Sequence, residues 1–98
     1  MRIRGMIKAF RCKETELIAQ GRRSRRFPPE IQRRAKMRLD RIDAASALDD
    51  LRLPPSHRLE ALVGNRAGQW SIRINDQWRI CFVWHDGDAV EVEITDYH

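Results

Sequence analysis

The fold of this 98-residue chain follows mainly from residues 70–95, WSIRINDQWRICFVWHDGDAVEVEIT. Apolar side chains occupy every second position in three segments of this stretch, at 70–74, 78–84 and 90–94. Such alternation is typical of strands with one buried face. Turn-forming residues separate the segments, and Asp86-Gly87 suits a tight hairpin. The stretch therefore predicts a three-stranded antiparallel meander with one apolar face.

Two helices are predicted upstream of the meander. The first covers residues 14–20 and ends at Gly21. The second covers residues 30–45 and follows Pro29, which suits a helix start. One face of the second helix is apolar at helical spacing, through Ile31, Ala35, Leu39 and Ile42. We expect the two helices to cover the apolar face of the sheet.

The remaining segments complete one domain. Residues 6–11 alternate apolar and polar side chains and predict a first strand, whereas residues 1–5 lie outside that pattern and are interpreted as an N-terminal extension. Residues 47–53 predict a further helical turn, and residues 54–68 a loop with at most a short strand. The element order β–α–α–β–β–β predicts a compact α+β domain over residues 6–98, with two N-terminal helices packed on an antiparallel-rich sheet.

The composition excludes several classes of protein. Hydrophobic residues make up 42% and charged residues 34% of the chain, which is typical of a soluble globular domain. No apolar run approaches the roughly 20 residues of a membrane helix, and none is long enough for a secretory signal. We therefore expect a cytoplasmic protein with no membrane partner. In that compartment Cys12 and Cys81 are expected to be free thiols.

The charge is distributed unevenly along the chain. Residues 1–44 carry fourteen basic and five acidic residues, whereas residues 86–98 carry five acidic and no basic residues. Most of the basic residues are arginine, which binds phosphate well, although a GC-rich genome would produce the same bias. A helical stripe of arginines is often only a solvated face, but a dense run in the preceding loop favours nucleic-acid contact. The candidates for RNA or ribosome binding here are Arg22, Arg23, Arg25, Arg26, Arg34, Arg38 and Arg41.

Familiar catalytic motifs are absent from the sequence. It contains no GxxxxGK[ST], HExxH or GxSxG motif, which disfavours nucleotide-dependent transferases, zinc hydrolases and serine hydrolases. His57, His85 and His98 are scattered, so we expect neither a metal site nor a cofactor. His57 and His85 are both expected to be exposed.

Arg79 is the first catalytic candidate, because it lies within the predicted strand 78–84. It is either a phosphate clamp or a polar position on a half-solvated sheet. The same alternatives hold for Arg73, which could share its face. In the preceding loop, Glu60 could act as a general base and Arg58 and Arg66 could contact phosphates, or all three could be solvated surface charges.

The C-terminal residues form a second candidate group. Asp96, Tyr97 and His98 are three consecutive titratable side chains. If the last strand continued, Asp96 and His98 would share one face and Tyr97 would occupy the other. They could transfer protons, or they could be a frayed polar tail, the usual state of chain ends.

Four strings of the sequence together resemble one protein family. They are MIKAF at 6–10, RLEALVGNRAGQWSI at 58–72, NDQWRICF at 75–82 and DYH at 96–98. This set resembles the HigB-type toxins of the RelE superfamily, over residues 6–98. The resemblance implies a compact sheet with two N-terminal helices, and the toxin of a type II toxin–antitoxin system. It also implies a ribosome-dependent endoribonuclease that cleaves mRNA without a metal or cofactor.

The resemblance further implies partners and roles. The partners would be a helix-turn-helix antitoxin of the HigA kind, the ribosome and mRNA, with operator DNA bound only through the antitoxin. The ribose 2′-OH would attack the adjacent phosphate. Arg79 would then stabilise the phosphate, and Asp96, Tyr97 and His98 would supply acid–base and stacking groups.

Two residues depart from the family pattern. Glu60 stands where many HigB proteins have a catalytic His, and Val63 replaces a Lys found in some relatives. A carboxylate can act as a base but cannot attract phosphate as a cation. The departures leave open a non-cleaving ribosome or RNA binder that blocks translation. A DNA-binding or corepressor module is a third alternative, but the sequence has no evident helix-turn-helix pair.

Overall fold

The structure, a computed structural model, describes residues 7–96 of the chain. Two α-helices come first, α1 (Lys13–Ala19) and α2 (Pro29–Ala44). Three short 3-10 turns lie in the second half, η1 (Leu48–Arg52), η2 (Pro55–His57) and η3 (Gly64–Arg66). The strands are β1 (Glu60–Ala61), β2 (Trp70–Arg73), β3 (Trp78–His85) and β4 (Asp88–Asp96).

The four strands form one antiparallel sheet in the order β1-β2-β3-β4. Ile72 of β2 lies opposite Ile80 of β3, which lies opposite Ile94 of β4. The predicted meander is therefore confirmed, with these apolar positions aligned on one face. Val90 was also predicted to lie on this face, which is wrong, because it pairs with Val83 while its neighbour Ala89 pairs with Trp84 and enters the core. A bulge interrupts the β3–β4 register between Cys81 and Val83.

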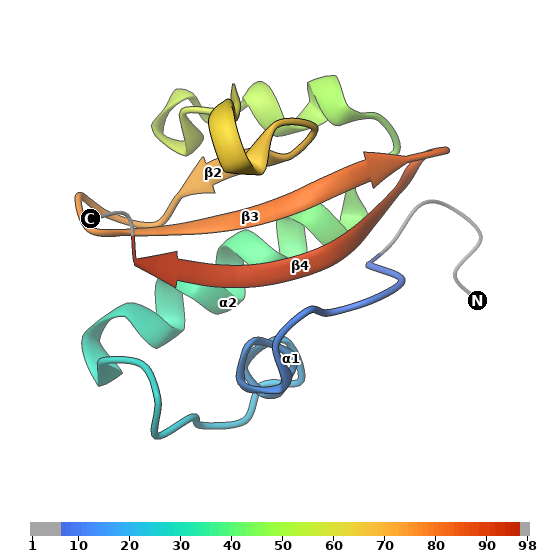
Figure 1. The fold of residues 1–98 in the computed structure, drawn as a ribbon. Helices are drawn as coiled ribbons and strands as arrows, with labels where there is room; N and C mark the ends of the chain where they lie inside the picture. Colours follow the sequence, from blue (N-terminus) through green and yellow to red (C-terminus); the bar gives the residue numbers. More distant parts are fainter. Residues whose placement is uncertain (1–6, 97–98) are drawn as a thin grey trace.

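The core lies between this apolar face and α2, which crosses behind the sheet in Figure 1. The predicted apolar face of α2 is confirmed, because the side chains at helical spacing are at most 3% exposed, namely those of Ile31, Ala35, Leu39 and Ile42. Full burial of one such Ile or Leu side chain contributes about 1.5–3 kcal/mol to stability. The shorter helix α1 packs against α2 and β4. Three half-buried tryptophans extend the core as expected: Trp70, Trp78 and Trp84.

The prediction of a first strand at residues 6–11 is wrong for residues 7–11, which are the part that the structure describes. That part makes only two isolated parallel bridges to β4, at Ile7 and Phe10. Glu91 of β4 has a left-handed backbone (φ 51°) between the two bridged positions of its strand. We attribute the missing ladder to this bend, because a continuous ladder needs an extended partner. The proposed extension, residues 1–5, lies outside the described residues.

The segment between α2 and β2 contains the predicted helical turn, as η1, and the predicted short strand, as β1. The expectation that His57 is exposed is wrong, because its side chain is fully buried. Its Nδ1 donates a hydrogen bond to the Leu51 carbonyl at 3.0 Å. Desolvation lowers the pKa of His57, which keeps the imidazole neutral. His85 is exposed, as expected.

None of the helices among residues 7–96 combines the length and the apolar character that a membrane crossing requires.

Candidate functional site

The face of the sheet opposite α2 carries polar side chains, and we call it the polar face. Successive side chains of a strand alternate between the two faces, and cross-strand partners share one. Since α2 covers Ile72, Ile80 and Ile94, their neighbours in sequence belong to the polar face. Two adjacent rows of partners lie there: Arg73, Arg79 and Thr95 in one, and Glu60, Ser71, Cys81 and Glu93 in the other.

Arg79 occupies the centre of the polar face and is only 6% exposed. Its Nε donates a hydrogen bond to Ser71 Oγ at 2.8 Å. Its Nη2 donates to the Arg58 carbonyl at 3.0 Å and lies 2.8 Å from Glu60 Oε1 in an ion pair. Arginine is seldom buried without such partners. The interpretation of Arg79 as a polar position on a half-solvated face is therefore wrong, whereas a phosphate clamp fits its surroundings.

Arg58 contributes its main chain to this arrangement. It follows η2 in a left-handed backbone conformation, with φ 47° and ψ 54°. This conformation is uncommon outside glycine, and it costs of order 1–2 kcal/mol. Here the turn presents the Arg58 carbonyl to Arg79, while the residue itself is exposed. The predicted phosphate contact through the Arg58 side chain is not tested by this geometry.

Glu60 is a partner of Arg79 whose side chain is itself accessible, since 47% of it is exposed. Strand β1 places it directly opposite Ser71. A hollow of about 290 Å³ lies beside it, lined by Ala61, Leu62, Val63, Asn65 and Arg66. Glu60 thus contacts the buried guanidinium and also lines an accessible hollow.

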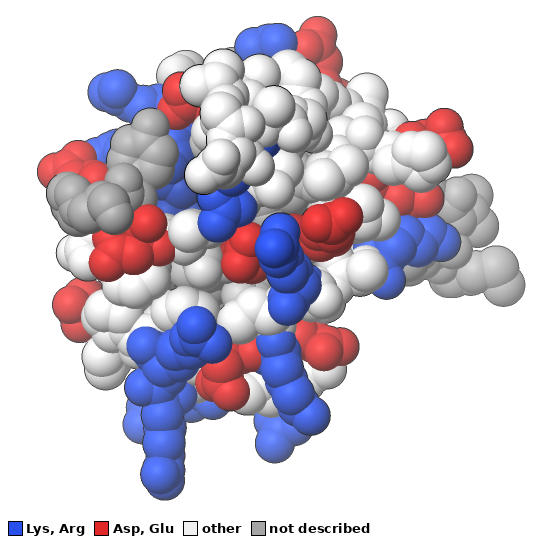
Figure 2. Space-filling view, viewed as in Figure 1, with Lys and Arg blue, Asp and Glu red and all other residues white. Residues whose placement is uncertain are grey.

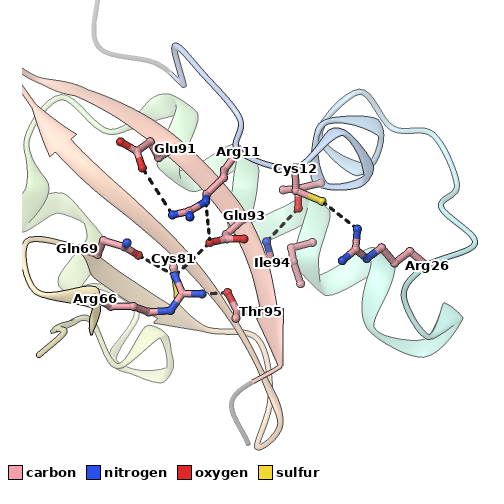
Figure 3. Close-up of polar contacts among 11 residues, drawn as sticks. Arg11, Cys12, Arg26, Arg66, Gln69, Cys81, Glu91, Glu93, Ile94 and Thr95 are labelled. Atoms are coloured by element: carbon pink, nitrogen blue, oxygen red, sulfur yellow. Dashed lines mark hydrogen bonds and ion pairs between the residues drawn. The ribbon is translucent and has the colours of Figure 1, made fainter. Parts of the chain in front are cut away.

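Arg66 belongs to a second polar network, shown in Figure 3. Its Nη1 donates to Gln69 Oε1 at 2.9 Å and to Glu93 Oε2 at 3.1 Å. Arg11 approaches the same Glu93 oxygen, with its Nε at 3.8 Å. The sequence did not indicate these carboxylate contacts, which occupy part of the hydrogen-bonding capacity of Arg66.

Arg73 lies in the same row as Arg79, so the predicted shared face is confirmed. Its Nη2 forms an ion pair with Asp76 in the turn between β2 and β3. Its carbonyl accepts a hydrogen bond from Arg38 Nε at 3.1 Å. Arg73 therefore adds positive charge at the end of the row.

Asp96 lies at the end of β4, opposite Trp78. By strand alternation its side chain points to the face opposite that of Thr95 and Arg79. Asp96 Oδ2 accepts a hydrogen bond from Gln77 Nε2 at 3.0 Å. Strand β4 thus does not bring Asp96 into the Arg79 row. Tyr97 and His98 lie outside the described residues.

The basic loop, which we define as Arg22, Arg23, Arg25 and Arg26, is fully on the surface. In Figure 2 long basic side chains project from the end of the molecule where the α1–α2 connection lies in Figure 1. This arrangement leaves the predicted RNA or ribosome contact sterically open.

The α2 arginine stripe, which we define as Arg34, Arg38 and Arg41, is more than a solvated face. Arg34 donates to the Ile74 carbonyl at 3.4 Å and Arg41 to the Leu53 carbonyl at 2.9 Å. Desolvation lowers the pKa of Arg38 first, and the nearby charges of Arg34, Arg41 and Arg73 lower it further. The stripe therefore ties two connecting segments to α2 and also concentrates positive charge.

Sequence reasoning missed Ser71 and the main-chain role of Arg58. A serine in a strand carries no functional signal by itself. The available signal was positional, since Ser71 lies on the same face as Arg79 in the predicted meander. The Arg58 carbonyl could not be found in this way, because every residue has a carbonyl and only the turn after η2 aims this one.

Known proteins resemble this chain in sequence and in fold. Residues 8–98 match the profile of the RelE-like toxin of the type II toxin–antitoxin system HigB. The chain is 45% identical over 76 residues to toxin HigB-1 of Vibrio cholerae, which covers 78% of this chain and 80% of that protein. It is 34% identical over 93 residues to endoribonuclease HigB of Proteus vulgaris, in an alignment that covers 95% of this chain and 100% of that protein. A YafQ mutant from E. coli shares the fold, with a TM-score of 0.58 at 15% identity over 99% of this chain and 94% of that one.

Proposed function

Because the chain belongs to the HigB-like toxins of the RelE type, the toxins of type II toxin–antitoxin systems, we propose that it cleaves mRNA on the ribosome without a metal ion. Endoribonuclease activity is supported by the Proteus vulgaris relative, which aligns with 95% of the chain. The structural observation that carries the proposal is the burial of Arg79 beside an accessible carboxylate.

The proposed reaction is transesterification within the RNA. The ribose 2′-oxygen attacks the adjacent phosphorus and loses its proton to a base. The 5′-oxygen leaves and takes a proton from an acid, so that a 2′,3′-cyclic phosphate and a 5′-hydroxyl remain. Negative charge accumulates on the phosphate oxygens in the transition state. A preorganised guanidinium in a poorly hydrated position stabilises such charge more strongly than one in water. Arg79 has this position.

Glu60 is the proposed base. It faces the accessible hollow and lies 2.8 Å from Arg79, so a phosphate that binds Arg79 comes close to its carboxylate. Phosphate oxygens would replace Glu60 at the guanidinium, because both are acceptors for the same N–H groups. The displaced carboxylate would then be available to accept the 2′-OH proton.

The terminal residues Asp96, Tyr97 and His98 are proposed as further acid–base and stacking groups, on the strength of the family resemblance. A protein that ends at residue 96 lacks Tyr97 and His98 and tests their part of this assignment. We expect it to fold, because chain ends rarely hold a core, and to lose its toxicity. Growth arrest by the shortened protein would contradict the assignment.

A type II toxin has an antitoxin, and we propose that this partner is a HigA-like helix-turn-helix protein through which operator DNA is bound. We further propose a cytoplasmic location, where ribosomes are found, and a toxin domain over residues 6–98 after a short extension at 1–5. Ribosomal RNA or mRNA would contact the basic loop, the α2 arginine stripe and three further arginines, Arg58, Arg66 and Arg73. Their charge and partial exposure support this role.

One observation favours a second candidate function. The ion pair with Glu60 partly neutralises Arg79. If phosphate cannot displace the carboxylate, the protein would bind the ribosome and block translation without cutting.

Primer extension on a defined mRNA, with and without programmed ribosomes, distinguishes the two functions. Ribosome-dependent cuts within A-site codons are expected, and they should persist in EDTA at concentrations that spare the ribosome. Arrested translation with intact mRNA would contradict the endoribonuclease and support the blocking binder.

A further inference from the structure

Ser71 is a buried polar residue that the reaction described above does not use. It lies in β2, directly opposite Glu60 of β1 and Cys81 of β3. Its side chain is fully buried, and its Oγ accepts the hydrogen bond from Arg79 Nε at 2.8 Å. A small residue at this point of the sheet also lets the Arg79 side chain cross the row to reach Arg58 and Glu60. The position therefore serves Arg79 through both its hydroxyl and its size.

The Arg79 partners Glu60, Ser71 and Arg58 differ in what a bound phosphate would do to them. Glu60 is charged and 47% exposed, so phosphate can replace it. Ser71 Oγ and the Arg58 carbonyl are neutral acceptors, and they bind nitrogens at Nε and Nη2. A guanidinium is planar, so two fixed nitrogens fix its plane. These two contacts can persist while phosphate takes the place of Glu60 at Nη2.

We propose that Ser71 is a positioning residue, which holds the Arg79 guanidinium in the orientation that stabilises the transition state. This inference rests on the proposed function, because it assigns Ser71 a part in the same reaction. Ser71 does not touch the substrate. It acts through Arg79, and its loss should therefore lower the rate of the chemical step more than substrate binding. A misplacement of about 1 Å at a reacting group can cost about a hundredfold in rate.

Steady-state cleavage on programmed ribosomes tests the proposal, with kcat and KM measured separately. We expect Ser71→Ala to lower kcat by roughly tenfold to a hundredfold at nearly unchanged KM. Ser71→Thr keeps the hydroxyl but adds a methyl group at a fully buried position, so it should recover only part of the kcat that Ser71→Ala loses. Should Ser71→Ala fold poorly, Ser71→Cys replaces the hydroxyl with a weaker acceptor of similar size and should show the same loss of kcat.

Thr15→Val is the matched control. Thr15 is also fully buried, and its Oγ1 accepts a hydrogen bond from the Ile94 amide at 2.9 Å, at the α1–β4 contact. The Thr15→Val variant should lower the melting temperature as the Ser71 variants do, but leave kcat unchanged. A similar kcat in Ser71→Ala and Thr15→Val would overturn the assignment.

Two further readouts separate positioning from general stabilisation. Ser71→Ala should cause no further loss of kcat in an Arg79→Ala background, whereas additive losses would show that Ser71 does not act through Arg79. The NMR signal of the Arg79 Nε–H reports the contact without any activity, and Ser71→Ala should shift it and speed its exchange with solvent. An unchanged signal would overturn the inference about Ser71. Wild-type protein that cuts no mRNA would instead overturn the proposed function.

Discussion

Arginine side chains are held differently in two regions of this molecule, on the polar face and along α2. On the polar face, Arg79 is 6% exposed and contacts a hydroxyl, a carbonyl and a carboxylate. In the α2 arginine stripe, Arg38 donates to a main-chain carbonyl at the end of β2, and Arg34 and Arg41 donate to carbonyls of connecting segments. Carbonyl partners tie segments of the chain together, whereas an exposed carboxylate is a partner that a substrate phosphate can replace. The partner set, rather than the density of arginine, therefore marks the candidate site.

The sharpest test of this comparison removes one arginine from each region. Arg79→Ala should lower cleavage by roughly 10²–10³-fold, the usual cost of removing one donor to a transition-state oxyanion, with little change in ribosome binding. Arg38→Ala should lose about 1–2 kcal/mol of stability with its hydrogen bond to the Arg73 carbonyl and weaken ribosome binding, but leave the cleavage rate on ribosomes saturated with toxin unchanged. Primer extension and thermal unfolding measure the two effects. Equal losses of binding and cleavage in Arg79→Ala would make Arg79 a docking residue.

The carboxylate partner provides the second test. Glu60→Gln keeps the shape of the side chain but removes its basicity, so cleavage should fall by about 10²-fold if Glu60 accepts the 2′-OH proton. Glu93→Gln is the control, because Glu93 is a carboxylate of the polar face that pairs with Arg66 and Arg11. Faster cleavage by Glu60→Gln would instead show that the carboxylate restrains Arg79.

Variants of the basic loop test the role of surface charge in ribosome binding separately from the cleavage reaction. Changing Arg22, Arg23, Arg25 and Arg26 to alanine should weaken ribosome binding and flatten its dependence on salt. Cleavage of ribosomes already saturated with toxin should be unaffected, because these side chains are separate from the Arg79 contacts. Filter binding at several salt concentrations measures the slope. An unchanged slope would remove the basic loop from the ribosome contact.

The smallest expected effect concerns His57, which is buried near the α2 arginine stripe. Its folded-state pKa is lowered from 6.5, by desolvation and by the charges of Arg38 and Arg41. The unfolded chain therefore takes up a proton below about pH 6.5 that the folded protein resists, so stability is intact above this pH and falls as the solution is acidified. His57→Asn keeps a donor for the Leu51 carbonyl and should reduce the loss of melting temperature between pH 7 and 5.5. The exposed His85 is the control, and a His85→Asn variant with the same effect would contradict the assignment.

Much of the fold was predictable because periodicity reports which side of an element is buried. The alternation around Ile72, Ile80 and Ile94 predicted the meander, and the spacing of Ile31 and Leu39 predicted the buried face of α2. The segment at 7–11 was mispredicted because alternation predicts an extended chain, but a continuous ladder also needs an extended partner. The bend at Glu91 was not visible in the sequence.

The candidate site was predictable only in part, for a related reason. Arg79 and Glu60 could be singled out by residue type and by family resemblance, but their 2.8 Å contact depends on β1 pairing with β2. His57 was expected to be exposed because it follows two prolines in a polar loop. It is buried because that loop folds back and presents the Leu51 carbonyl to Nδ1.

Local pattern in the amino-acid sequence was thus sufficient for the α+β class and the strand faces, since these depend on neighbours one to four residues apart. The family was recognised from four strings that together span most of the chain. The surroundings of Arg79 came from long-range packing. Three groups from earlier parts of the chain meet at the Arg79 guanidinium. They are the carbonyl of the left-handed turn at Arg58, the carboxylate of Glu60 in the short strand and the buried hydroxyl of Ser71. Burial and hydrogen-bond geometry are properties of such non-local contacts, and they turn an ordinary strand arginine into a candidate phosphate clamp.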